Sequence, residues 1–139
     1  MKDNVLFFMI PKAQVECVED NFSVRQTLEK MEYHRYTAVP LIDQEGKYIG
    51  TISDGDLLWY IKEKGLSLEG SERVSILKVR RQRDIKPVSI SNDMDDLVNL
   101  ILEQNFVPIV DDLGHFIGIV TRRSVINFLV NESRCNKDK

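Results

Sequence analysis

Two short polar stretches of this 139-residue chain combine hydroxyl and charged side chains in a way that suits the binding of a small anion. Residues 53–56 read Ser-Asp-Gly-Asp, and residues 121–124 read Thr-Arg-Arg-Ser. Each stretch follows an apolar run with strand character and opens a segment with helical periodicity. Because the first backbone N–H groups of a helix have no partner inside it, such positions attract phosphate.

The spacing of Ser53 and Asp56 allows two interpretations. A carboxylate three residues after a helix-starting hydroxyl can accept hydrogen bonds from both hydroxyls of a ribose. The same spacing also makes a capping box, with Ser53 as the N-cap and Asp56 as a less usual acid at the third helical position. Both interpretations stay open, since a capping residue can also face a ligand.

The two stretches belong to an internal repeat. Residues 39–53 return as residues 107–121, shifted by 68 positions without a gap, and Val, Pro, Asp, Gly, Ile and Gly coincide in that register. Each copy predicts a buried strand, an Asp-x-x-Gly turn and a return strand. The return strands contain Gly50 and Gly118, where the missing side chain lets another backbone or a ligand approach.

Helical patterns flank both hairpins. In the first copy, Ser23 is the expected N-cap of a helix before the hairpin, and Leu57 and Ile61 lie on the apolar face of a helix after it. A short strand is expected before each copy, so the unit β-α-β-β-α occurs twice. The predicted fold class is therefore α+β, an α/β sandwich-like pair of repeats that share one core.

The repeat also predicts the domain organisation. The chain divides into a first motif, a linker, a second motif and a flexible polar tail, at residues 8–62, 63–84, 85–130 and 131–139. Within the linker, residues 71–79 are expected to form a short helix. A basic run begins near the end of this helix and consists of Lys78, Arg80, Arg81 and Arg83. This run is interpreted either as a solvated helix end or as a contact for an anion or a protein partner.

Composition excludes several classes of protein. Hydrophobic residues make up 42% and charged residues 29% of the chain, which indicates a folded domain rather than disorder. The net charge of −3 argues against a generally basic protein that binds nucleic acid. The longest apolar run, residues 5–11, is too short to span a bilayer and lacks the features of a signal peptide. We therefore expect a cytoplasmic protein without membrane insertion.

The chain offers little for catalysis or for metal binding. His34 and His115 have no Cys, Glu or second His at metal-ligand spacing, and no glycine-rich phosphate loop is present. The acidic cluster at residues 93–96 is better explained by the dipole of a helix start than by calcium. We therefore predict no catalytic residues, no metal site, no required cofactor and no enzymatic activity.

The residues of both copies resemble the cystathionine-β-synthase (CBS) domain family. The family pattern is a strand Val-Pro-apolar-apolar-Asp, a turn Gly, then apolar-Gly-apolar-apolar-Ser/Thr-x-x-Asp before a helix. Residues 38–56 match this pattern, whereas residues 106–124 depart from it because Ser124 replaces the final Asp. The resemblance covers residues 8–130 and implies a tandem pair, or Bateman module, packed about a pseudo-two-fold axis. It further implies two clefts between the repeats, which commonly bind adenine nucleotides, and a homodimer.

The resemblance assigns ligand contacts to residues of both copies. Asp56 would take the ribose hydroxyls, and Thr51 and Ser53 would line the sugar and phosphate. The adenine would be bordered by two groups of residues: Tyr36, Ala38 and Val39 on one side, and Ile10, Pro11 and Lys12 on the other. In the second copy Thr121 is retained, and the forked guanidinium groups of Arg122 and Arg123 are suited to holding phosphates.

Within the family, the chain is similar to small stand-alone CBS-pair proteins of Gram-positive bacteria, some of which bind cyclic di-AMP and signal to partner proteins. Residues 9–11, 35–40 and 121–125 carry this similarity. It implies a non-catalytic regulatory module that senses an adenine nucleotide (AMP, ADP, ATP or cyclic di-AMP) and signals to an unidentified effector protein. The alternative is a CBS-pair scaffold for dimerisation and interaction, without a functional nucleotide site.

Overall fold

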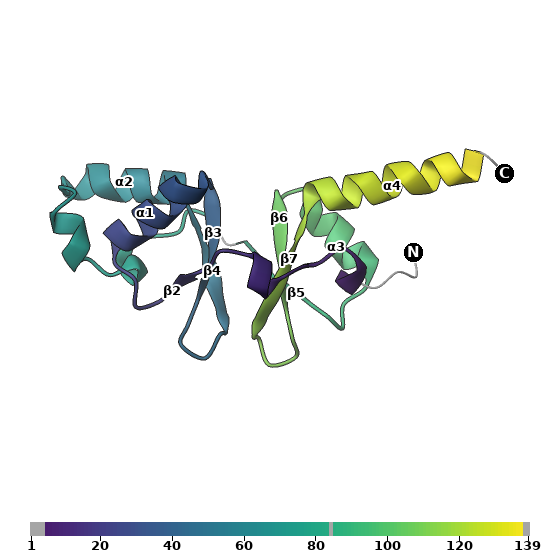
Figure 1. Cartoon of the computed structure of the whole chain (residues 1–139), viewed down its shortest axis with the longest axis horizontal. Helices are drawn as coiled ribbons and strands as arrows, with labels where there is room; N and C mark the ends of the chain where they lie inside the picture. Colours follow the sequence, from purple (N-terminus) through teal and green to yellow (C-terminus); the bar gives the residue numbers. More distant parts are fainter. Residues whose placement is uncertain (1–4, 84, 138–139) are drawn as a thin grey trace. The chain divides into compact units, whose positions relative to one another are not determined.

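The structure is a computed structural model that describes residues 5–83 and 85–137. The chain divides into two compact units, each named here after the repeat whose hairpin it contains (Figure 1). The first-repeat unit comprises residues 16–83. The second-repeat unit comprises residues 85–137 together with the N-terminal residues 5–15.

The first-repeat unit is built on a three-stranded sheet in the order β2-β3-β4. Strand β2 is parallel to β3, and β3 is antiparallel to β4. Helices α1 and α2 lie on one side of this sheet (Figure 1) and share with it a hydrophobic core that includes Leu41, Ile52 and Leu57. The elements are β2 (Val18–Glu19), α1 (Val24–His34), β3 (Ala38–Ile42), β4 (Tyr48–Ser53) and α2 (Asp54–Lys64).

The second-repeat unit has a four-stranded sheet in the order β1-β7-β6-β5, covered by α3 and α4 (Figure 1). Its hydrophobic core is a separate cluster that includes Leu97, Ile109 and Val120. Each sheet and its own helices thus bury a cluster of their own. The elements are β1 (Ile10–Pro11), β5 (Val88–Ser89), α3 (Met94–Ile101), β6 (Phe106–Val110), β7 (Phe116–Thr121) and α4 (Arg122–Lys137).

The two hairpins confirm the repeat at the level of single hydrogen bonds. The turns are closed by Asp43 in one copy and Asp111 in the other, each of which accepts bonds from the N–H groups two and four residues ahead. The turn glycines Gly46 and Gly114 have φ of 86° and 87°, a left-handed conformation that disfavours a side chain. An Asp-x-x-Gly turn therefore specifies both hairpins, as the sequence predicted.

Side chains cap the helix starts as predicted. Ser23 caps α1 in a capping box with Gln26, where each side chain bonds the other's backbone N–H at 3.1 and 2.8 Å. Asp93 caps α3 by accepting a bond of 3.1 Å from the N–H of Asp96. The acidic cluster of residues 93–96 thus serves a helix start.

The segment predicted as a linker is part of the first-repeat unit. Two backbone bonds attach it to the start of α1, one from the N–H of Val24 to the carbonyl of Val74 and one from the N–H of Ile76 to the carbonyl of Phe22. Ile76 is fully buried in the core of the unit. In place of one short helix, the segment forms two 3₁₀ turns, η3 (Gly70–Arg73) and η4 (Ile76–Lys78).

The C-terminal residues also differ from the prediction. Residues 131–137 continue α4, where the sequence predicted a flexible tail, and residues 138–139 lie outside the described part of the chain. No Gly or Pro occurs between Arg122 and Lys137 to end the helix. Among the described residues, no helix is both long and apolar enough to cross a membrane.

A glycine in each return strand lets another chain segment pack against it. A Cβ built on Gly118 would lie 2.4 Å from the carbonyl oxygen of Ile10 in β1, which is backbone and cannot rotate away. A Cβ on Gly50 would instead lie 2.5 Å from the Nε of Arg81, which belongs to a flexible side chain.

We expect Gly118→Ala to lower the free energy of unfolding by about 1–3 kcal/mol, because the added methyl group must push β1 off β7. Gly50→Ala should cost less, since Arg81 can change its rotamer. Urea unfolding of both variants measures the difference. Equal costs, or a larger cost for Gly50→Ala, would contradict this account of the packing.

Asp111 provides a pH-dependent contribution to stability. Partial desolvation acts to raise the pKa of Asp111, but hydrogen bonds from the N–H groups of His115 and Leu113 and from the His115 ring outweigh it. The pKa therefore lies below its usual value of 3.8. Since a depressed pKa favours the folded state when the carboxyl group is ionised, this stability is present above the unfolded pKa and is lost as the pH falls through the folded one.

Asp111→Asn should remove that contribution. The difference in unfolding free energy between wild type and variant is then largest near neutral pH and shrinks between about pH 5 and about pH 2. Urea unfolding across this range measures it. A difference that stays constant over the range would show that ionisation of Asp111 is not involved.

Candidate functional site

Asp56 lies at the junction of β4 and α2 and is almost fully buried, with 4% of its surface exposed. Its Oδ2 accepts a bond of 3.0 Å from the N–H of Ser53, and the Ser53 hydroxyl accepts one of 3.1 Å from the N–H of Asp56. The predicted capping box is therefore confirmed. Asp56 also accepts a bond of 2.9 Å at Oδ1 from the N–H of Gln82.

These bonds leave part of the Asp56 carboxylate unused. A carboxylate has about four acceptor positions, two on each oxygen. The described residues take one position on Oδ2 and one on Oδ1. The number of acceptor positions therefore allows the carboxylate to cap the helix and to accept from a ligand hydroxyl. The sequence did not predict the bond from Gln82, because nothing local in it brings residue 82 to residue 56.

Of the two predicted sugar-lining residues, Thr51 is buried within β4 and Ser53 is half-buried at its end. The Thr51 hydroxyl lies 2.7 Å from the hydroxyl of Tyr48, with which it shares a hydrogen bond. The Ser53 hydroxyl is occupied by the helix cap. In the first-repeat unit, Thr51 and Ser53 thus lie in β4, and Asp56 lies in the first turn of the helix that follows it.

The predicted adenine-bordering residues follow α1. Arg35 ends that helix with a left-handed φ of 59°, and Tyr36 then turns back so that its ring stacks on His34, with 5.3 Å between centroids. Tyr36 remains 43% exposed, whereas the Val39 side chain is buried in the hydrophobic core. Tyr36 and half-buried Ala38 therefore offer side-chain surface to a ligand, whereas Val39, 1% exposed, offers almost none.

The other predicted adenine-bordering residues belong to the second-repeat unit. Ile10 and Pro11 form β1, which pairs antiparallel with β7, and Lys12 follows with an exposed side chain. Their partners across the strands are Ile119 and Gly118. The N-terminal segment thus joins the unit that contains the second hairpin, although the sequence assigned it to the first motif.

The second repeat replaces the carboxylate by a hydroxyl. Thr121 caps α4 by accepting a bond of 3.1 Å from the N–H of Ser124, and the two side-chain hydroxyls lie 2.8 Å apart. Arg122 donates from Nε to the carbonyl of Ile101 at 2.9 Å, at the C-terminal end of α3. Arg122 therefore has a structural partner at a helix end, while Arg123 is exposed.

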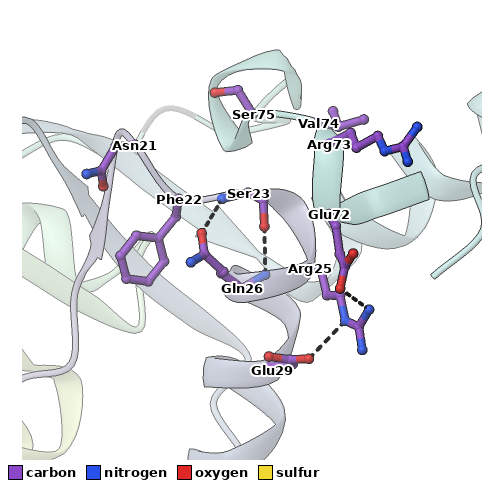
Figure 2. A pocket seen from close by; sticks show the side chains of 10 residues that line it. All are labelled: Asn21, Phe22, Ser23, Arg25, Gln26, Glu29, Glu72, Arg73, Val74 and Ser75. Atoms are coloured by element: carbon purple, nitrogen blue, oxygen red, sulfur yellow. Dashed lines mark hydrogen bonds and ion pairs between the residues drawn. The ribbon is translucent and has the colours of Figure 1, made fainter. Parts of the chain in front are cut away.

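A polar groove of about 530 Å³ opens beside the start of α1, in the first-repeat unit (Figure 2). Within it, Arg25 forms ion pairs with both Glu29 and Glu72, whereas Arg73, which also lines the groove, forms none with a described residue. The side chains of Ser23 and Gln26 are used by the capping box. We assign no ligand to this groove, which holds none of the predicted site residues. Elsewhere in the described chain, no cluster of three or more His, Cys, Asp or Glu residues suits a metal ion.

Comparison with known protein families identifies both repeats. The family model described as "CBS domain" matches residues 7–63 and again residues 79–131, which together make up most of the chain. The second match begins inside the segment that the sequence predicted as a linker.

Solved structures share the fold. CbpB in complex with cyclic di-AMP superposes with a TM-score of 0.88 over 98% of this chain and 90% of that chain, at 23% identity. CbpB of Listeria monocytogenes, also in complex with cyclic di-AMP, has a TM-score of 0.82 at 27% identity, over 94% of this chain and 98% of that one. CBSX2 in complex with AMP has a TM-score of 0.73 at 27% identity, over 94% and 98% of the two chains.

Among curated proteins, the chain is 28% identical over 143 residues to the chloroplastic CBS domain-containing protein CBSX2 of Arabidopsis thaliana. The match covers 86% of this chain and 60% of CBSX2. The chain therefore spans about three fifths of the length of this relative.

Asp56→Ala tests the structural role of the carboxylate. The variant should lose about 1–3 kcal/mol of unfolding free energy, because the N–H groups of Ser53 and Gln82 lose their acceptor in a part-buried place. Ser124→Ala, the matched change in the second repeat, should cost less, since it removes only the bond between two hydroxyls. Urea unfolding compares the variants, and an equal or greater cost for Ser124→Ala would contradict this role for Asp56.

Proposed function

The chain belongs to the CBS domain family, and from this premise we propose that it is a non-catalytic regulatory module that binds an adenine nucleotide. The observation that carries the proposal is the complete Ser-x-x-Asp motif of the first repeat. There the Asp56 carboxylate is held in place by two backbone N–H groups and still has acceptor positions for the hydroxyls of a ribose. CBS-pair proteins are generally regulatory, and CbpB and CBSX2 have been crystallised with cyclic di-AMP and AMP, respectively.

In this proposal the predicted residues keep the roles that the sequence assigned to them. Asp56 accepts from the ribose, Thr51 and Ser53 line the sugar and phosphate, and Tyr36 offers its exposed ring to the adenine. The remaining contacts come from Ala38 and Val39 in the first-repeat unit, and from Ile10, Pro11, Lys12, Thr121, Arg122 and Arg123 in the second. Arg123 is the arginine better suited to phosphate there, since the Nε of Arg122 is used by Ile101.

The proposal also includes a cytoplasmic homodimer that signals to an effector protein. Exposed apolar side chains at equivalent positions of α2 and α4 support self-association, with Leu58 61% and Ile126 49% exposed. A ligand changes the affinity for an effector only if it binds better to one of two conformations. The effector is therefore expected to distinguish the nucleotide-bound protein from the free one.

Calorimetry with AMP, ADP, ATP and cyclic di-AMP tests the proposal. At least one of them should bind, and the deoxyribose form of that ligand should bind about 10- to 100-fold more weakly, because it lacks a hydroxyl that donates to Asp56. Deoxy ligands are preferable to Asp56 variants, since they leave the helix cap intact.

The outcomes separate the proposal from its alternative. Equal affinity for ribose and deoxyribose ligands would remove Asp56 from the site. No binding of any of the four nucleotides, together with a stable dimer by sedimentation, would favour the alternative, a dimerisation and interaction scaffold.

A further inference from the structure

The first-repeat unit contains a charged residue, Arg81, that is not part of the CBS motif and whose neighbour in the chain, Gln82, bonds Asp56. Arg81 is half-buried, whereas its basic neighbours Arg80 and Arg83 are exposed. Its side chain lies against Gly50 in β4, where an added Cβ would be 2.5 Å from Nε and 3.0 Å from Cζ. The basic run therefore divides into solvated residues and one arginine that packs on the sheet.

The buried part of Arg81 lacks a partner. Its Nε is shielded from solvent and forms no hydrogen bond with any described residue. No described carboxylate forms an ion pair with its guanidinium group. Because burying a charged donor without a partner is unfavourable, the arrangement is stabilised when an anion comes to this group.

The second repeat shows that the packing itself does not need a charge. Gly118 is the counterpart of Gly50, and an added Cβ there would lie 2.4 Å from the carbonyl oxygen of Ile10 and 2.6 and 2.8 Å from the Cγ and Sδ of Met9. Backbone and an unbranched apolar side chain thus fill the equivalent place without a charge. Packing on the strand glycine therefore does not explain why residue 81 is charged.

The position of the next residue, Gln82, offers an explanation for the charge. The N–H of Gln82 bonds Oδ1 of Asp56, so the backbone immediately after Arg81 is fixed to the carboxylate proposed to hold a ribose. A 5′-phosphate is joined to the ribose through a single carbon. An arginine whose backbone is anchored one residue from this contact can therefore serve the phosphate of the same nucleotide.

We propose that Arg81 is a ligand-binding residue, which binds the phosphate of a nucleotide whose ribose is held by Asp56. This inference rests on the proposed function. A guanidinium group suits the role because its planar fork donates two parallel hydrogen bonds to phosphate oxygens. Because Nε itself is shielded from solvent, the phosphate accepts from the terminal nitrogens of the fork.

Arg81→Met tests the inference, because Met9 shows that this side chain fits on the strand glycine. With whichever nucleotide binds the wild type best, calorimetry should show affinity for the variant reduced by about tenfold or more. Affinity for adenosine, which has no phosphate, should stay within about twofold of its wild-type value. Arg80→Met is the matched control: it removes the same charge from an exposed neighbour and should leave nucleotide affinity within about threefold, since a surface charge acts only weakly.

Each outcome decides the question. An Arg81→Met variant that binds nucleotide as well as Arg80→Met does, or that loses adenosine and nucleotide equally, overturns the role of Arg81. A wild type that binds no nucleotide overturns the proposed function itself, which is a distinct result. If Arg81→Met does not fold, Arg81→Lys decides, because it keeps the charge and loses the fork. The Arg81→Lys variant should bind the nucleotide, but several-fold more weakly than wild type does. Equal affinity of this variant and wild type would overturn the inference.

Discussion

The rest of this structure depends on one constraint: in each return strand, another segment of the chain packs closely against a glycine. In the second-repeat unit the carbonyl of Ile10 lies over Gly118, and in the first-repeat unit the side chain of Arg81 lies over Gly50. Any side chain at either glycine would need the space that the segment occupies. The constraint therefore decides which residues belong to each unit. It assigns the N-terminal segment to the second hairpin and the end of the predicted linker to the first.

The same placement gives Asp56 its second backbone partner. A capping box needs only the bonds between Ser53 and Asp56, and these form locally along the chain. The bond from Gln82 exists because residues 79–83 run beside β4, where Val79 is buried in the core of the first-repeat unit. With both oxygens held, the carboxylate has a defined orientation before a ligand arrives. Such preorganisation lowers the cost of binding, because less freedom is lost.

The sequence predicted what is encoded locally and missed what depends on distant pairing. The turns at Gly46 and Gly114, the N-caps Ser23 and Ser53 and the two hairpins follow from short patterns of residue type, and all are present. The attachment of residues 5–15 to the second hairpin was not predictable, since β1 has two residues and no periodicity.

Packing of the linker through Ile76 and the bond from Arg122 to Ile101 were missed for the same reason, because neither leaves a local signature. At the candidate site, the sequence predicted the residues that share one stretch of chain, Thr51, Ser53 and Asp56. It did not single out Arg81, which reaches Gly50 from 31 positions further along the chain.

The differences between the repeats bear on what each unit offers a nucleotide. The first-repeat unit has Asp56 where the second has Ser124, and it packs Arg81 on Gly50 where the second packs Ile10 and Met9 on Gly118. A nucleotide presents ribose hydroxyls, which donate hydrogen bonds, and a phosphate, which accepts them. The proposed site matches both groups at once, because the proposal takes an acceptor and a cation from the first repeat. The second repeat has exposed cations, Lys12 and Arg123, but a hydroxyl where the carboxylate would be. Its chemistry matches phosphate better than ribose, so the proposed function gives the two repeats different roles even though their folds repeat.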